Sequence, residues 1–288
     1  NGNLLLGSGV NSLLNEAGST YNSGDTVDLG GGTFTNNGYF SPGALANVMT
    51  SSNSNGMTTI IGNFVQGTSG QLISNIGFQA GASALDFTDF VTVTGTATLN
   101  GLVTLEPSTG AGKPGSFHIP ILTANGGITD NGIALNPLFA TGTPSTTAVF
   151  SASLETLGNT LFVNYLIDYD PNGLTNNASN FGSTVNQIQN AGIASYQVIA
   201  GQLLVIPTLE GLQRAYDSLT GEGITASQQA TFGARAHFAS TVMSGADSMA
   251  CCDERDHRIA QECRKRTRTW FEAMYLDGHQ GGNPNTAS

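Results

Sequence analysis

The sequence predicts an all-β fold, a right-handed parallel β-helix (a solenoid), followed by an α-helical linker. Glycine supplies 38 of the 288 residues and charged residues only 10%, a composition that disfavours an ordinary helical enzyme. Apolar and polar residues alternate in short runs over residues 1–170, which is the period of a strand with one buried face. Segments of turn, short strand and turn also recur at loosely similar spacing, as the coils of a solenoid do.

The clearest strand pattern runs from Val91 to Leu105. Its odd positions are apolar or small, and its even positions are threonine or asparagine with one exception. The same alternation returns around Ile119 and Val163, and each run is closed by Gly, Asn or Pro. These runs predict short strands that each bury one face.

Short strands also suit a sandwich or a propeller, so the choice of a solenoid depends on the turns. Glycine-rich repeats at 24–34 and 56–64 favour stacked coils, which lie about 4.8 Å apart and align like residues into ladders. A flexible linker of similar composition is excluded, because 39% of the residues are hydrophobic and their alternation allows them to be buried.

The pattern changes after Asp170, where Pro171-Asn172-Gly173 indicates a turn. We therefore assign 1–170 to the β domain and 171–268 to a helical linker. An apolar stripe predicts a helix that starts near Pro207 and ends near Gly221, formed by Leu209, Leu212, Tyr216 and Leu219. A second, weakly apolar helix is expected over 224–249, a segment of small and polar residues without proline.

The net charge of −11 is unevenly distributed. Lys113 is the only basic residue before Arg214, so nucleic-acid binding by this long acidic part is not expected. A basic cluster near the C-terminal end could contact phosphate or anionic lipid, although a solvated helix end is the favoured interpretation: Arg264, Lys265, Arg266 and Arg268.

Neither a membrane-spanning helix nor a signal peptide is predicted. The longest apolar stretches, such as 203–207, are far shorter than the roughly 20 residues that a spanning helix needs. No charged segment followed by an apolar one is present near Asn1. We therefore expect the chain to be a fragment whose targeting signal lay upstream.

Two pairs of stretches in the β region are similar to one family of exported proteins. In the first pair, a Ser-Pro-Gly turn within Asn37–Gly43 precedes a Gly-Asn-aromatic-x-Gln strand within Ile61–Gln66. The second pair, Asp86–Gly101 and Ile121–Ala124, is similar to the last coils of many passenger domains.

A third stretch carries the most specific signal. Leu219–Ala230 is similar to a Leu-Ser-Gly-Glu-x-x-Ala-Ser-x-Gln-x-Ala signature, and Trp270–Ala273 stands where a first barrel strand usually begins. With all three stretches in the family's order, the chain resembles the type V autotransporters of bacteria.

The resemblance implies a role for each part of the chain. Residues 80–170 would form terminal coils that cap the passenger and help to nucleate its folding, as an autochaperone region does. The helix over 224–249 would thread the barrel pore, and 269–288 would begin a truncated β-barrel translocator.

The function implied by the resemblance is a structural and export module, a stalk and linker that support translocation and surface display, and not an enzyme. Its location would be the bacterial cell surface and outer membrane, reached through the periplasm. Its partners would be its own C-terminal β-barrel, the barrel assembly machinery and periplasmic chaperones. The alternatives are an adhesin that binds host surfaces or glycans and, less favoured, a β-helix enzyme that acts on polysaccharides.

Few residues of the β region suit catalysis. Asp86 and Asp89 could form the carboxylate pair of a glycosidase or lyase, but turn-capping aspartates are the favoured interpretation. His118 lies on the polar face of its strand, where an exposed histidine is the simplest expectation. No catalytic, cofactor-binding or metal-binding residue is predicted, and no cofactor.

The cysteines leave two alternatives open. Cys251, Cys252, His257 and Cys263 are residue types that zinc accepts, but their spacing matches no familiar ligand pattern. A disulfide between Cys252 and Cys263 is favoured over the metal site. In one continuous helix their Cα atoms would lie about 16 Å apart, far beyond the roughly 7 Å that a disulfide tolerates, so the bridge requires a turn near Asp256.

Overall fold

The structure, a computed structural model, describes residues 2–43, 56–77, 88–107, 112–220 and 231–240. Its contacts divide the chain into two compact units, Asn1–Tyr216 and Asp217–Ser288. No helix in the described part of the chain is long and apolar enough to cross a membrane.

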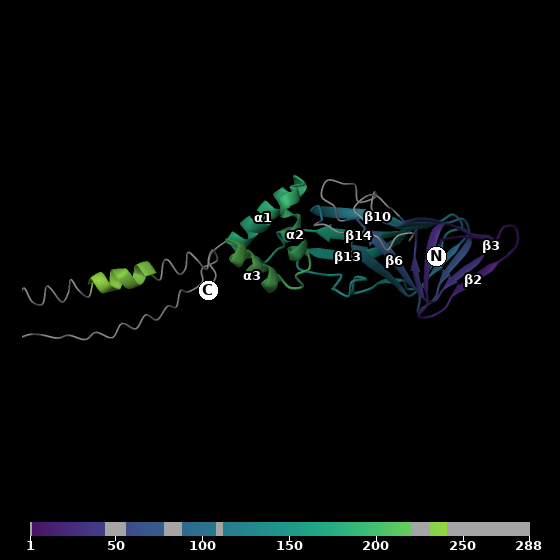
Figure 1. The fold of residues 1–288 in the computed structure, drawn as a ribbon, viewed down its shortest axis with the longest axis horizontal. Helices are drawn as coiled ribbons and strands as arrows, with labels where there is room; N and C mark the ends of the chain where they lie inside the picture. The colour runs from purple at the N-terminus through teal and green to yellow at the C-terminus, as the bar shows by residue number, and fades with distance from the viewer. Residues whose placement is uncertain (1, 44–55, 78–87, 108–111, 221–230, 241–288) are drawn as a thin grey trace, which may run out of the picture. The chain divides into compact units, whose positions relative to one another are not determined.

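Fourteen strands of the described residues form a sheet in the first unit (Figure 1). In chain order they are β1 Gly2–Leu5, β2 Ser12–Asn15, β3 Thr20–Asn36, β4 Tyr39–Ser41, β5 Met57–Gln66, β6 Gln71–Ile76, β7 Phe90–Val93, β8 Ala97–Leu99, β9 Leu102–Pro107, β10 Gly115–Ala124, β11 Ile128–Asp130, β12 Ala134–Leu135, β13 Phe150–Leu157 and β14 Thr160–Ile167.

Most neighbouring strands run parallel. β3 pairs with β5, β5 with β7 and β7 with β10, while β4, β6, β9 and β12 form a second parallel series. The register aligns like residues, and one threonine ladder passes through four strands: Thr26, Thr59, Thr92 and Thr123.

The predicted fold class is wrong in its topology. β10, β14 and β13 pair antiparallel, so the sheet is mixed and nearly closed, and helices complete the same unit. An all-β right-handed parallel β-helix therefore does not describe this chain. The period-two pattern could not reveal this, because side chains alternate between faces in parallel and antiparallel strands alike.

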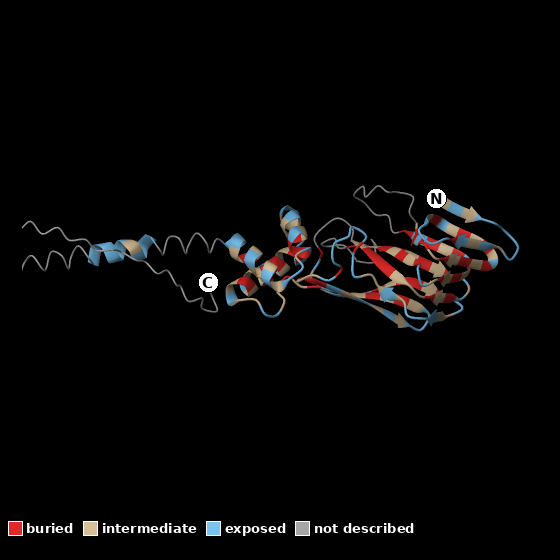
Figure 2. Ribbon diagram, turned by 90° about the horizontal axis from the view of Figure 1, so that it is seen from below, coloured by how far each residue is buried: buried red, intermediate tan, exposed pale blue. Residues whose placement is uncertain are grey.

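The predicted side-chain directions are confirmed where strands were expected. Buried positions alternate with intermediate or exposed ones along the strands (Figure 2). In β7, β8 and β9 the apolar odd positions all point inward: Val91, Val93, Ala97, Leu99, Val103 and Leu105. Alternation therefore gave the inward face correctly even though it did not give the strand direction.

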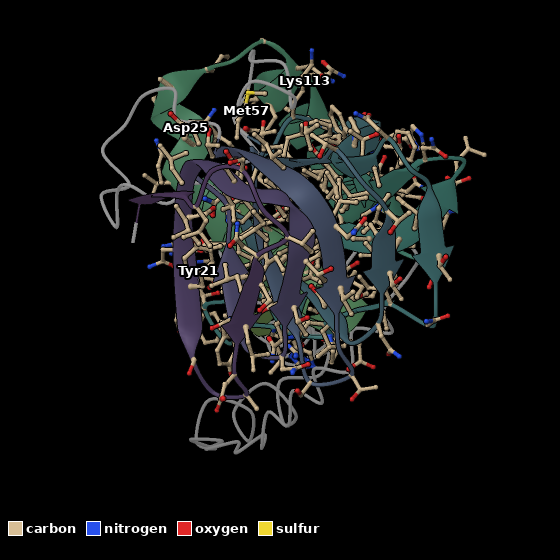
Figure 3. The ribbon with its side chains drawn as sticks, turned by 90° about the vertical axis from the view of Figure 1, so that its right-hand side faces the viewer. Tyr21, Asp25, Met57 and Lys113 are labelled. Atoms are coloured by element: carbon tan, nitrogen blue, oxygen red, sulfur yellow. The ribbon has the colours of Figure 1, made fainter. Side chains whose placement is uncertain are left out.

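Side chains fill the interior that the strands enclose (Figure 3). Phe34, Phe40 and Phe64 are fully buried, with ring centroids 5.0 to 5.7 Å apart. Tyr21 packs edge-on against Phe34 at 5.5 Å. Each such ring buries a large apolar area, on the order of 150–250 Å², so this cluster contributes strongly to the stability of the core.

Four helical segments follow the sheet in the described residues up to 220: α1 Asn176–Asn190, the 3₁₀ turn η2 Ala194–Tyr196, α2 Gln197–Leu204 and α3 Leu209–Thr220. α3 confirms the predicted helix, and its Leu212 and Tyr216 are fully buried. The Thr175 side chain caps α1, and Gln213 of α3 makes two hydrogen bonds of 3.0 Å to the same threonine.

The helices are bonded to the end of the last strand. The Tyr216 hydroxyl donates a hydrogen bond of 2.6 Å to the carbonyl oxygen of Tyr169, and the Tyr169 amide donates to Asn186 of α1. Residues 1–216 thus form one unit, and the proposed boundary at 170 stays a prediction. In the second unit, residues 231–240 are helical, whereas 224–230 and 241–249 of the expected pore helix lie outside the described residues.

Gly182 of α1 sets how closely the helix approaches the sheet. A Cβ atom added there would overlap the carbonyl oxygen of Tyr169. We expect Gly182→Ala to lower the free energy of unfolding by about 1–3 kcal/mol, because rigid backbone must move apart. Gly201→Ala in α2 is the matched control: nothing lies within 4 Å of its added Cβ, so it should be neutral or slightly stabilising. Urea denaturation of both variants compares them, and equal stabilities would contradict the close-packing argument.

Candidate functional site

The antiparallel strands carry the most developed polar cluster on an exposed face of the described residues. Their inward residues, such as Ile119 and Val163, belong to the core, so the alternate residues point outward. The register places His118 of β10 opposite Asn164 of β14, and Asn164 opposite Ser153 of β13. Phe162 and Glu155 form the adjacent cross-strand pair.

This face is hollowed into a shallow groove of about 440 Å³. The residues that line it come from all three strands: Ser116, Phe117, His118, Ser151, Ala152, Ser153, Asn164, Tyr165 and Leu166. The groove therefore exists only when the three strands pair, because each of them contributes part of its lining.

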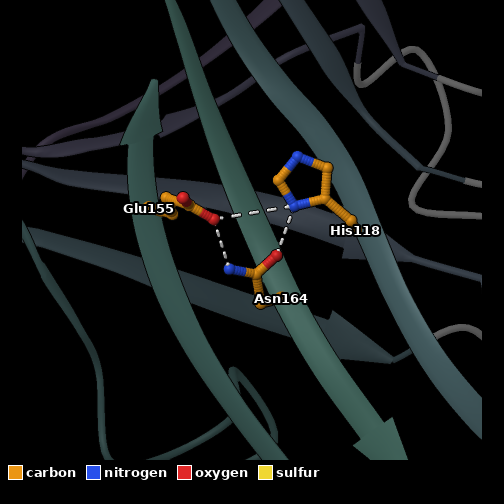
Figure 4. A network of polar contacts seen from close by, with 3 residues as sticks. All are labelled: His118, Glu155 and Asn164. Atoms are coloured by element: carbon orange, nitrogen blue, oxygen red, sulfur yellow. Dashed lines mark hydrogen bonds and ion pairs between the residues drawn. The ribbon is translucent and has the colours of Figure 1, made fainter.

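Three side chains form a polar network across the strands (Figure 4). Asn164 Nδ2 donates a hydrogen bond of 2.8 Å to Glu155 Oε2, and Asn164 Oδ1 is hydrogen-bonded to His118 Nδ1. His118 Nδ1 lies 3.7 Å from Glu155 Oε2. The imidazole ring is stacked on Phe162 with centroids 4.0 Å apart. Each of the three polar side chains is therefore held in place by at least one other.

The network determines the tautomer of the neutral histidine. An ionised carboxylate only accepts hydrogen bonds, so Glu155 requires the amide nitrogen of Asn164. The amide oxygen then faces His118, whose Nδ1 must carry the proton. In the neutral ring, Nε2 is consequently an acceptor. The side chains of His118 and Glu155 are 47% and 46% exposed, so both can reach a solute.

Asp89, the other acidic residue considered, has a structural environment. Its carboxylate is 1% exposed and accepts hydrogen bonds from the amides of Gly56 at 2.8 Å and Asn75 at 3.0 Å. Burial raises the pKa of Asp89 to about 7, although these two amides act in the opposite direction. The carboxylate thus bridges two segments that are distant in the sequence, and these bonds are not the local ones of a turn-capping aspartate. Asp86 lies outside the described residues.

Among the remaining candidates that the structure describes, only His118 lines this groove. His118 is an exposed strand residue, as predicted. Lys113 is exposed and labelled in Figure 3. Within the part of the chain that the structure describes, no group of three or more His, Cys, Asp or Glu residues could hold a metal ion. Outside that part lie the cysteines, including the Cys252–Cys263 pair, together with His257 and the basic cluster at 264–268.

Sequence reasoning missed Asn164, Glu155 and Phe162 as members of a site. A signal existed in the two-residue turn Gly158-Asn159, which is typical of a hairpin and aligns Glu155 with Phe162. Nothing comparable placed His118 beside them, because β10 is separated from the hairpin by a long stretch of chain.

Comparison of the chain with protein-family models, with curated proteins and with solved structures found no match.

Proposed function

We propose that this chain is a structural and export module of a bacterial autotransporter, which supports translocation and display at the cell surface. One observation carries the proposal: β10 belongs to two ladders at once. It pairs parallel with β7 through Leu122–Ala124 and antiparallel with β14 over Gly115–Thr123. The antiparallel strands therefore end the parallel series of β3, β5, β7 and β10 while remaining hydrogen-bonded to it.

Such an arrangement suits a terminal cap that folds early, and we call the three antiparallel strands β10, β14 and β13 the cap. β13 and β14 form a hairpin of eight cross-strand pairs around a short turn. Its contacts are local, so their formation loses little loop-closure entropy. The parallel strands pair with partners far away in the sequence, such as Thr26 with Thr59, and are expected to form more slowly. A formed cap would offer β10 as an edge on which the parallel strands add one after another.

The residues that hold the cap belong to the shared core. Tyr165 is buried and stacks on Phe117 with centroids 4.7 Å apart, and Val163 is fully buried in the central strand of the cap. These buried residues of the cap are uncharged, which suits a structural scaffold better than a catalytic site. The proposal takes its cellular setting from the autotransporter resemblance, including a barrel partner, the assembly machinery and periplasmic chaperones.

The test is surface display of the full chain. We would place all 288 residues between a cleavable signal peptide and a complete autotransporter barrel in a Gram-negative host. Digestion of intact cells with external protease then reports exposure. We expect the unaltered chain and Leu166→Asp to be displayed, because Leu166 is 43% exposed. Val163→Asp, on the buried face of the same strand, should be retained in the periplasm, because it places a charge in the core of the cap.

A third variant distinguishes a specific effect of the cap on display from a general loss of protein stability. Phe64→Ala weakens the core among the parallel strands and leaves the cap intact, so its display should remain near that of the unaltered chain. Equal retention of Val163→Asp and Phe64→Ala would contradict a special role for the cap. Failure of the unaltered chain to reach the surface would overturn the export function itself.

A further inference from the structure

The groove over β10, β14 and β13 has no part in the proposed export function. Its walls nevertheless hold a fixed network of hydrogen-bonding side chains at an exposed position. We propose that this groove is a binding site for neutral saccharides, in which His118 of the lining and Glu155, which lies beside the groove and is hydrogen-bonded to Asn164 of the lining, bind the sugar hydroxyls.

Pre-organisation is the first argument. Asn164 is bonded on one side to Glu155 and on the other to His118, and His118 is stacked on Phe162. These contacts fix the rotamers of long side chains before any ligand arrives. Binding then loses less side-chain entropy than it would on an ordinary polar surface.

The inventory of donors and acceptors matches a polyol. His118 Nε2 accepts a hydrogen bond in the neutral ring, and the half-exposed Glu155 carboxylate accepts others. Three exposed serines, Ser116, Ser151 and Ser153, supply hydroxyls that both donate and accept. Sugar hydroxyls are themselves donors and acceptors, so they can satisfy both kinds of group.

Charge favours a neutral ligand over an anionic one. Glu155 lies 3.7 Å from His118 of the groove lining, and Lys113 is the only lysine or arginine in the first 213 residues. A uronic acid, a sialic acid or a sulfated sugar would meet a carboxylate, and the residues that line the groove include no lysine or arginine to offset the repulsion. Leu166, which lines the groove and is partly exposed, offers apolar surface to the C–H face of a sugar ring.

Size and shape set the expected affinity. The groove volume lies near the lower end of the roughly 300–1,000 Å³ typical of small-molecule sites, enough for a short stretch of glycan. Because the groove is open, only one side of a sugar would be buried. We therefore expect weak binding, with a Kd on the order of 1 mM.

The test uses the full chain and four neutral hexasaccharides of glucose, mannose or N-acetylglucosamine units: maltohexaose, cellohexaose, mannohexaose and chitohexaose. Calorimetric titration and saturation-transfer NMR should detect binding of at least one. His118→Ala and Glu155→Gln should each weaken it about tenfold, which corresponds to the loss of one hydrogen bond. Leu157→Ser is the matched control, because Leu157 is 60% exposed on β13 and neither lines the groove nor belongs to the polar network, and it should leave the Kd unchanged.

Three outcomes would overturn the proposal. One is the absence of binding by all four sugars at ten times the expected Kd. Another is equal affinity in the His118→Ala variant, provided that its urea midpoint matches that of the unaltered chain. The third is preference for hexagalacturonate or for trilysine over every neutral sugar, since either would point to a charged ligand.

Discussion

Replacing Phe64 by alanine is expected to lower the free energy of unfolding by about 3–5 kcal/mol. Phe64 is fully buried in β5, and its ring lies 5.4 Å from Phe34 and 5.7 Å from Phe40. The change removes apolar area from the core and leaves a cavity that rigid neighbouring strands cannot fill. It also removes two aromatic contacts, which contribute beyond the area they bury.

Urea denaturation followed by circular dichroism measures this loss. Met57→Ala is the control, because Met57 lies at the start of the same strand and is 56% exposed (Figure 3). It should change stability by less than about 0.5 kcal/mol. Similar losses in both variants would mean that the aromatic cluster does not form the core described here.

The second large effect is a pH dependence caused by Asp89. Burial raises the pKa of this carboxyl in the folded state to about 7, and the nearby Glu106 acts in the same direction. In the unfolded chain an aspartate titrates near 3.9. Between about pH 4 and pH 7 the folded state therefore holds a proton that the unfolded state has lost.

The sign of the effect follows from this difference. Asp89 favours folding most strongly below about pH 4, and that contribution is lost as the pH rises through about 7. At about 1.4 kcal/mol for each unit of difference in pKa, the loss is on the order of 4 kcal/mol. The free energy of unfolding should thus fall between pH 4 and pH 8.

Denaturation of the chain and of Asp89→Asn across this range isolates the contribution of Asp89. The asparagine cannot ionise, so the free energy of unfolding of the unaltered chain minus that of Asp89→Asn should decrease as the pH rises. Asp25→Asn serves as the control, because Asp25 is exposed on β3 and its removal should leave the pH dependence in place. A difference between the chain and Asp89→Asn that stays constant from pH 4 to pH 8 would disprove a protonated Asp89.

The antiparallel strands β10, β14 and β13 show how much of the candidate site the sequence predicted. The alternation around Ile119 and Val163 placed His118 on an exposed face, as the structure has it. It gave no partner for His118, because pairing with Asn164 depends on β10 lying beside β14. Side-chain direction is a local property of the backbone, whereas strand neighbours are chosen by contacts over long distances in the chain.

The sequence by itself determined the inward and outward residues of the strands and the helix at Leu209–Thr220. Both follow from local periods, two residues in a strand and 3.6 in a helix. Only the tertiary structure decided that β10, β13 and β14 run antiparallel, that Asp89 is buried, and that His118, Asn164 and Glu155 meet. These features arise when distant segments pack together and exclude water, and no local period records which segments those will be.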